Sequence, residues 1–238
     1  MRKIQILILI ITFSLSCYSQ DNENKNGFIG ISIGPSFPEG DFAKKELYYE
    51  KSGLAINGLN LKLINFGYNI NKFIGITGIL TGAAHPIDID ALLAGYSNIE
   101  PSLSWEIESS YWYYGAMMGG LLISLPNNDY RIDIDIRALI GLSSATTPEL
   151  KVTATDGFNS LTLVQEKANS SSTAYNIGMC LRYIILPKLY VNVNIDYFFS
   201  EYEFNVTIKD SSGSNIENKF EQPIESINLT FGLAYRIK

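Results

Sequence analysis

The 238-residue chain has few of the residues that build disulfide frameworks or transition-metal sites, with two cysteines and one histidine. Cys17 falls inside an N-terminal leader pattern, so Cys180 is the only thiol expected in the mature protein. An intramolecular disulfide is then impossible, despite the export that such a leader predicts. One thiol and one imidazole also argue against a zinc or copper site. We therefore expect no metal and no cofactor.

Positive charge is also scarce. Eighteen Lys and Arg residues stand against 24 Asp and Glu, which gives a net charge of −6 at pH 7. An acidic chain repels polyanions, so nucleic acid is not expected as a partner. The sequence also lacks a glycine-rich phosphate loop, a zinc signature and a nucleophile elbow. These absences favour a protein that is not an enzyme and has no catalytic residues.

The first residues have the layout of a secretory signal peptide. The basic pair Arg2–Lys3 precedes an apolar stretch, Ile4–Leu15, that is too short to span a bilayer comfortably as a helix. We expect cleavage after Ser19. Residues 1–19 are then the signal peptide and residues 20–238 form a single domain, since no linker or repeat divides them. An uncleaved N-terminal anchor is the alternative.

Lipidation of Cys17 is a second alternative for the N-terminus. A lipoprotein signal needs Leu three residues before the lipidated Cys, and here Ser14 occupies that position while Leu15 comes one residue too late. The spacing therefore argues against lipidation.

The main structural signal is alternation with a period of two residues. Apolar residues alternate with small or polar ones in three segments, Ile132–Leu142, Leu189–Phe199 and Ser226–Ile237. Each run exceeds the roughly five or six residues of an ordinary strand and matches the roughly nine to eleven that a tilted strand needs to cross a bilayer. The same alternation predicts a first strand over Gly27–Phe37, and less regular runs predict four more strands, Gly58–Tyr68, Phe73–Gly82, Tyr111–Leu125 and Thr173–Ile185.

The predicted connections alternate in length. The short ones are Asn69–Lys72, Pro126–Asp129 and Leu186–Lys188. The long, polar ones are Pro38–Asn57, His85–Ser110, Thr146–Ser172 and Val206–Ile224. Short periplasmic turns and long external loops are typical of membrane barrels, and an even strand number places both termini on the periplasmic side.

The apolar rows are predicted to face lipid and the small polar rows to face the barrel lumen. The interior of an eight-stranded barrel is just wide enough for side chains, and rows of Ile, Leu, Val and Phe would overfill it. Aromatic residues near both ends of the strands indicate two interfacial belts. The sequence thus predicts an all-β fold, an eight-stranded antiparallel up-and-down transmembrane β-barrel.

The chain resembles the small outer-membrane β-barrel proteins of Gram-negative bacteria typified by the OmpA membrane domain and OmpX. The resemblance covers residues 27–238 and rests on the opening GFIGISIGPSFPEGDF, the three short turns and the ending INLTFGLAYRIK. It implies a location in the cell outer membrane, with outer-membrane lipid and the barrel-assembly machinery as partners. Such proteins often end in an aromatic residue that this machinery reads, whereas here Tyr235 is the last aromatic.

Eight charged residues are predicted by the alternation to point into the lumen. Buried charges must be paired or hydrogen-bonded, so we favour a polar network that fills the barrel over a conducting or catalytic lumen. The eight are Lys62, Arg131, Asp133, Asp135, Arg137, Arg182, Asp196 and Arg236.

His85 is the one residue for which the resemblance suggests catalysis. Some barrels of this size are lipid-A-modifying enzymes that use a His with a nearby hydroxyl or acid at the outer rim, and Ser109 or Glu108 would be the partners here. We instead expect His85 to be a polar loop residue. The segment 85–110 holds five acids and no Lys or Arg. Calcium prefers oxygen ligands, but the spacing matches no calcium loop, so solvated surface is favoured.

We therefore expect a structural or surface-interaction role, with an extracellular ligand bound at the loops. The alternatives are a conduit for small solutes or hydrophobic ligands, and a lipid-A-modifying enzyme that uses His85. A sealed polar lumen favours the first role, and a continuous cavity favours the conduit.

Overall fold

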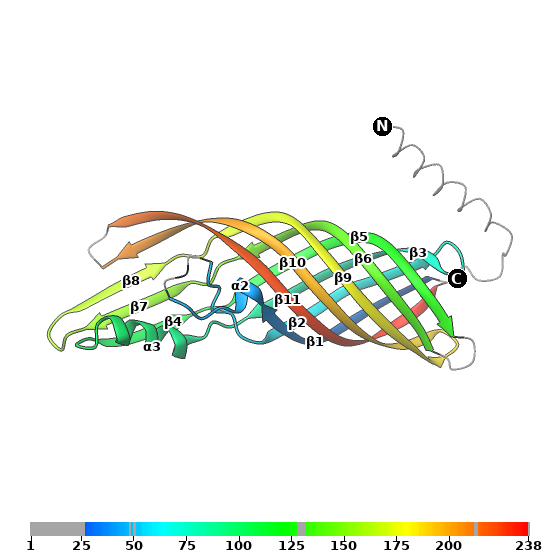
Figure 1. Ribbon diagram of the computed structural model, residues 1–238, viewed down its shortest axis with the longest axis horizontal. Coiled ribbons are helices and arrows are strands. Elements are labelled where there is room, and N and C mark those ends of the chain that lie inside the picture. The colour runs from blue at the N-terminus through cyan, green and yellow to red at the C-terminus, as the bar shows by residue number, and fades with distance from the viewer. Residues whose placement is uncertain (1–26, 48, 50, 128–131, 212–213, 238) are drawn as a thin grey trace, which may run out of the picture.

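The computed structural model describes residues 27–47, 49, 51–127, 132–211 and 214–237. Figure 1 shows a barrel that continues at one end into a smaller extension. No helix in the described ranges is both long and apolar enough to cross a membrane. The barrel strands are β1 Gly27–Glu39, β2 Gly58–Asn69, β3 Ile74–His85, β5 Trp112–Asn127, β6 Ile132–Thr146, β9 Asn169–Leu186, β10 Leu189–Asp210 and β11 Asn215–Ile237.

These eight strands close into a ring. They pair antiparallel in the order β1-β2-β3-β5-β6-β9-β10-β11, and β11 returns to pair with β1. The closing register joins Gly27 to Ile237 on one side of β1 and to Tyr68 on the other. Each predicted strand corresponds to one strand of the ring, so the eight-stranded antiparallel barrel is confirmed.

The two ends of the barrel differ. The short connections after Asn69 and after Leu186 lie at the same end as Gly27 and Ile237, and we call this the turn end. The third predicted turn, Pro126–Asp129, falls partly outside the described residues. The opposite end, which we call the loop end, carries the extension.

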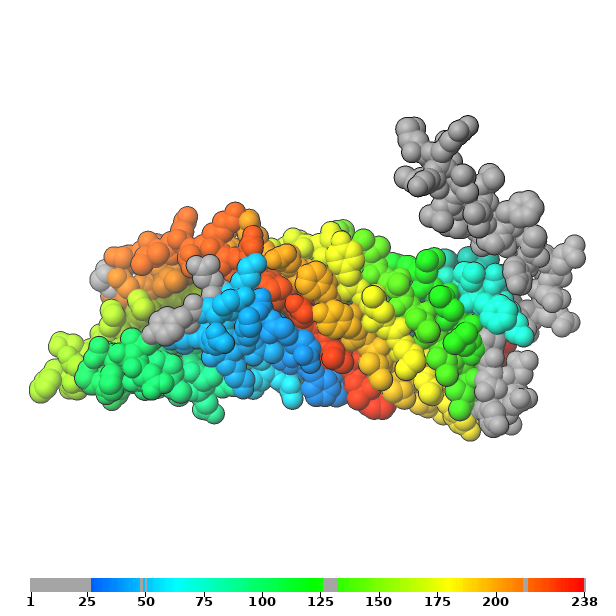
Figure 2. Space-filling view, viewed as in Figure 1, coloured from blue at the N-terminus to red at the C-terminus, as the bar shows by residue number. Residues whose placement is uncertain are grey.

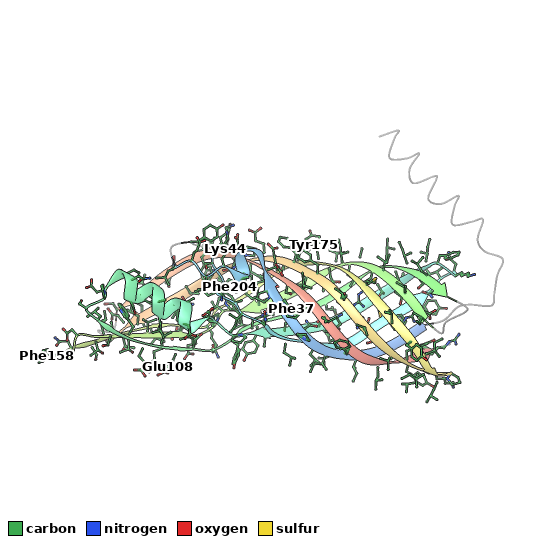
Figure 3. The ribbon with its side chains drawn as sticks, turned by 60° about the horizontal axis from the view of Figure 1, so that its bottom comes forward. Phe37, Lys44, Glu108, Phe158, Tyr175 and Phe204 are labelled. Atoms are coloured by element: carbon green, nitrogen blue, oxygen red, sulfur yellow. The ribbon has the colours of Figure 1, made fainter. Side chains whose placement is uncertain are left out.

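Along the strands of the barrel wall, apolar side chains face outward and polar side chains face the lumen. Ile31 and Leu142 are 61% and 70% exposed, whereas their neighbours Ser32 and Ser143 are buried. Exposed tyrosines mark both ends of this apolar band, and Tyr175 is the labelled example near the loop end (Figure 3). Closed strands with an apolar outer band satisfy every backbone group while facing lipid.

A β-bulge in β2 explains why its alternation is irregular. The pairing of β2 with β3 shifts register between Lys62 and Ile64, so that Leu63 and Ile64 both face outward. The inward rows therefore run through Lys62 and then Asn65. A bulge adds one residue to one strand and so changes the phase of the side chains beyond it.

The extension begins where β10 and β11 leave the ring. β9 pairs with β10 as far as Ser200, and β1 pairs with β11 from Glu225, but the β10–β11 hairpin continues to Lys209 and Asn215. Three short strands continue this sheet in the order β10-β8-β7-β4, and helix α3 packs on β4 (Figures 1 and 2). Their bounds are β4 Ser104–Ser109, β7 Leu150–Thr155, β8 Ser160–Gln165 and α3 Ile89–Ile99.

The prediction of long loops was therefore wrong for three of the four connections. Segment 85–110 holds α3 and β4, segment 146–172 holds β7 and β8, and segment 206–224 forms the ends of β10 and β11. These strands are polar because they stand outside the apolar band, where only the face turned toward the interior of the extension is apolar. Ile107 and Val152, which pair across β4 and β7, are buried on that face.

The fourth connection folds back over the barrel mouth. Residues 40–57, here called the mouth segment, begin with the short helix α2 Gly40–Ala43. The N–H of Ala55 donates to the carbonyl of Phe42 (3.0 Å), and that of Ile56 donates to the carbonyl of Pro86 (3.0 Å). The first bond closes the mouth segment on itself, and the second holds it against the loop end of the barrel.

Candidate functional site

One charge cluster lies in the middle of the lumen and joins three strands. Asp196 of β10 forms ion pairs with Lys62 of β2 and with Arg137 of β6, the latter at 2.7 Å. Arg137 also donates to the amide oxygens of Asn65 (2.9 Å) and Asn194 (3.2 Å). The three charged side chains are at most 2% exposed. The desolvated charges therefore have close partners, as burial requires.

The position of this cluster follows from the order of the strands. Around the ring, β2 and β6 are three steps apart, β6 and β10 two, and β10 and β2 three. Side chains that meet from three such strands cross the centre of the barrel. Gly178 of β9 leaves the necessary room, since a Cβ there would lie 2.0 Å from Oδ1 of Asp196.

A second cluster lies nearer the turn end. Arg182 of β9 forms an ion pair with Asp135 of β6 (2.7 Å), and Asp135 also accepts a hydrogen bond from the hydroxyl of Ser124 (2.7 Å). The Arg182 guanidinium lies 4.2 Å from the ring centroid of Phe28 and 5.5 Å from that of Tyr190. Cationic guanidinium groups stack favourably on aromatic faces.

Two further predicted lumen residues lie outside these clusters. Asp133 is 3.9 Å from Arg182, and its side chain is 24% exposed. Arg236 is half-buried, and its backbone N–H donates to the carbonyl of Lys188 (2.9 Å). Arg131 lies outside the described residues. The structure thus brings five of the eight predicted residues into the two buried clusters.

His85 is not the exposed loop residue that we expected. It is the last residue of β3, its side chain points inward, and it is fully buried. Nδ1 donates to the carbonyl of Ile56 (3.0 Å), which leaves Nε2 to accept from the hydroxyl of Ser36 (2.9 Å). Its suggested partners lie elsewhere, with Glu108 paired to Lys151 and Ser109 donating to the carbonyl of Ser110.

Aromatic side chains surround His85 at the loop end of the lumen. The rings of Tyr114 and Phe198 stack at 4.5 Å, and Phe204 packs 5.8 Å from Trp112. Figure 3 shows Phe204 where the barrel meets the extension. Trp112 donates from Nε1 to the carbonyl of Gly53 (2.9 Å), which ties these rings to the mouth segment. We call this group the aromatic seal; it consists of Phe42, Trp112, Tyr114, Phe198, Tyr202 and Phe204, all buried.

The acidic segment 85–110 folds into α3 and β4, and four of its five acids are exposed, as expected for a solvated surface; they are Asp90, Glu100, Glu106 and Glu108. Asp88 caps α3 by accepting a hydrogen bond from the N–H of Ala91 (2.9 Å), and it forms an ion pair with Lys45 of the mouth segment (2.5 Å). The hydrogen bond from Lys45 and the N–H of Ala91 hold the pKa of Asp88 below its ordinary value. Within the described ranges, no three His, Cys, Asp or Glu side chains are grouped as metal ligands.

Sequence reasoning missed the extension and the aromatic seal, although the extension had a local signal. Residues 161–163 and 150–154 carry short apolar alternations, and the Asp156-Gly157 pair between them is typical of a hairpin turn. Gly157 has a φ of +94°, and Asp156 accepts hydrogen bonds from two backbone N–H groups of the turn. The aromatic seal had no local signal, because its members come from distant segments of the chain.

A closed ring of eight antiparallel strands, with an apolar outer band and a polar interior, defines a small β-barrel of the outer-membrane type, and the protein belongs in the outer membrane.

No family model matches the sequence, and no curated protein does. Among solved structures, the chain is similar to a major outer membrane protein from Thermus thermophilus, with 14% identity, coverage of 90% of this chain and 100% of that chain, and a TM-score of 0.48. It is similar to the attachment invasion locus protein Ail of Yersinia pestis, with 16% identity, coverage of 89% of this chain and 99% of that chain, and a TM-score of 0.39. It is also similar to outer membrane protein W of E. coli, with 14% identity, coverage of 91% of this chain and 100% of that chain, and a TM-score of 0.36. These values are low, and the assignment of the fold rests on the strand pairing of this chain.

Proposed function

We propose that the protein is a non-enzymatic, non-conducting barrel that anchors its loop-end extension in the outer membrane and presents it to the exterior as an interaction surface. The observation that most directly supports a non-conducting barrel is the cluster of Lys62, Arg137 and Asp196 across the centre of the lumen. Outer-membrane lipid and the barrel-assembly machinery are its partners within the envelope.

The lumen is obstructed at two separate levels. The buried ion pairs lie in the middle of the barrel, and the aromatic seal lies at the loop end. A conduit for solutes or hydrophobic ligands needs a continuous path along the axis. Opening one here would require buried, paired charges to separate, which costs several kcal/mol.

A rim enzyme is not favoured by the surroundings of His85. Catalysis by a histidine needs access to substrate and a group that orients the ring, usually a carboxylate. His85 is fully buried, and its two described hydrogen-bond partners are a serine hydroxyl and a backbone carbonyl. We therefore propose that His85 holds the mouth segment on the barrel.

Conductance tests the closed lumen. Full-length protein reconstituted in planar lipid bilayers should give no stepwise ion current above that of protein-free bilayers. A heat-modifiability gel on the same preparation shows that the protein is folded. Stepwise currents from folded protein would contradict a closed barrel and favour the conduit.

Mass spectrometry of lipid A tests the enzyme alternative. Lipid A from cells that carry the native protein and from cells that carry the His85→Ala variant should have the same acyl composition.

A further inference from the structure

A cavity of about 680 Å³ opens above the aromatic seal, between the mouth segment and the extension. This volume falls in the range of roughly 300–1,000 Å³ that is usual for small-molecule sites. Its apolar lining comes from the mouth segment, α3, β5, β7 and β11, and includes Leu47, Leu54, Leu92, Trp112, Leu150 and Phe220. An apolar body that enters this cavity leaves water and is stabilised by the hydrophobic effect.

The wall formed by β10, β11 and the mouth segment is charged. Lys51 forms ion pairs with Glu221 (3.0 Å) and Glu201 (3.3 Å), and Lys219 pairs with Glu203 (2.8 Å). Glu203 and Glu221 line the cavity together with both lysines, whereas Glu201 meets this wall through its ion pair with Lys51, so three carboxylates share two ammonium groups here. Glu221 and Glu203 are each paired with a lysine, but their side chains are 57% and 54% exposed, so a ligand cation can reach both carboxylates and compete with the lysines for them.

The wider loop end carries charge of the same sign. Residues 39–57, 86–111, 147–168 and 201–225 hold 18 Asp and Glu against seven Lys and no Arg, a net charge of −11. The rest of the chain is net positive, since the whole carries −6. A concave site inside such a field concentrates cations and repels anions.

We propose that this cavity binds an amphipathic organic cation, with its apolar body on the floor formed by Leu54, Leu92 and Leu150 and its amine against the carboxylates of Glu221 and Glu203. The proposal rests on the proposed function, because the cavity takes ligand from the exterior only if the loop end is external. It adds the class of ligand, which the proposed function leaves open.

Three probes of nearly equal size test the ligand class. Full-length protein in lipid nanodiscs is titrated calorimetrically at pH 7 with 4-phenylbutylamine, 4-phenylbutan-1-ol and 4-phenylbutanoate, and heats from empty nanodiscs are subtracted. The amine should bind about tenfold more tightly than the alcohol, and the carboxylate more weakly than both. Added salt should reduce the differences in affinity among the three probes, because the carboxylates are exposed and their charges are screened.

Two variants locate the site. Glu221→Gln should weaken amine binding about fivefold and leave alcohol binding unchanged, since it removes one charge beside the amine. Glu108→Gln is the matched control. Glu108 is also exposed and paired with a lysine (Lys151, 3.0 Å), but it does not line the cavity. Both variants should keep the heat-modifiable form on gels, because both residues lie outside the ring.

The outcomes separate the two proposals. An amine that binds no better than the carboxylate, or equal effects of Glu221→Gln and Glu108→Gln, would overturn the ligand class while a silent bilayer leaves the closed barrel standing. Stepwise conductance would overturn the proposed function whatever the probes do. Preferential amine binding that Glu221→Gln weakens and Glu108→Gln does not supports the inference.

Discussion

At the scale of single residues, the lumen aspartates show that side chains with the same inward alternation can lie in very different environments. Alternation along β6 and β10 points Asp133, Asp135 and Asp196 inward alike. In the structure, Asp196 forms ion pairs with two buried cations, whereas Asp133 lies near the turn end, partly exposed and 3.9 Å from Arg182. The difference depends on depth along the barrel and on partners across it.

Asp196→Asn should therefore be far more harmful than Asp133→Asn. The first change leaves Lys62 and Arg137 buried with no counter-charge and should lower the free energy of unfolding by about 3–5 kcal/mol. The second removes a distant, partly solvated interaction, and its cost should be about 1 kcal/mol or less because Asp135 still pairs with Arg182. Urea unfolding in lipid vesicles measures both. Equal losses would show that Asp196 is as hydrated as Asp133.

At the scale of elements, β10 shows why the predicted strand stopped too early. From Val191 to Phe199 the outward positions are apolar, as lipid requires. Beyond Ser200 the outward positions become charged, with Glu201 and Glu203, while the inward ones become apolar, with Phe204. The strand continues, but its hydrophobic phase inverts. The outward face of the strand contacts lipid within the membrane and must be apolar there. Beyond the membrane the same face contacts water, which favours polar residues.

The outer hairpin should accordingly be dispensable for the barrel. Replacing residues 205–219 by Asn-Gly joins Phe204 to Phe220, which already pair, through a turn that suits a two-residue hairpin. The ring pairs of β10 and β11 all lie below this cut. The trimmed protein should retain the heat-modifiable gel shift and the strand-rich circular dichroism of the full chain. Loss of both would mean that the hairpin is needed for the ring to form.

At the scale of the whole molecule, the two ends of the barrel differ, because the turn end has only short connections and the loop end carries the extension. Figure 1 shows the extension at one end and the short turns at the other, and Phe158 lies at the far tip of the extension (Figure 3). Gly27 and Ile237, which pair, mark the turn end. An even number of barrel strands returns the chain to the side from which it started.

Cysteine labelling on intact cells tests the orientation. Phe158→Cys, at a position that is 97% exposed, should react with a membrane-impermeant maleimide, whereas Lys188→Cys in a short turn should react only after the outer membrane is permeabilised. The native Cys180 is buried in the lumen and should stay unlabelled in the folded protein. Labelling of Lys188→Cys on intact cells would reverse the orientation and place the extension in the periplasm.

The barrel wall can be predicted from local sequence pattern. A strand that crosses lipid must show one apolar face over its full length, so the eight wall strands, their alternating faces and the inward row of charges follow from local pattern. The pattern weakened where a bulge changed the phase, as at Leu63 and Ile64, and it inverted where water replaced lipid outside, as beyond Ser200.

Which side chains meet across the lumen and above it cannot be predicted from local pattern, because it depends on how the strands are arranged in space. Lys62 and Asp196 are 134 residues apart, and no local rule selects them over the other inward charges. The same holds for the inward orientation of the His85 side chain, for the aromatic seal and for the cavity beneath the extension. Each depends on segments that become neighbours once the ring has closed. Alternation fixes the face on which a side chain lies, while strand register and ring closure fix its partners.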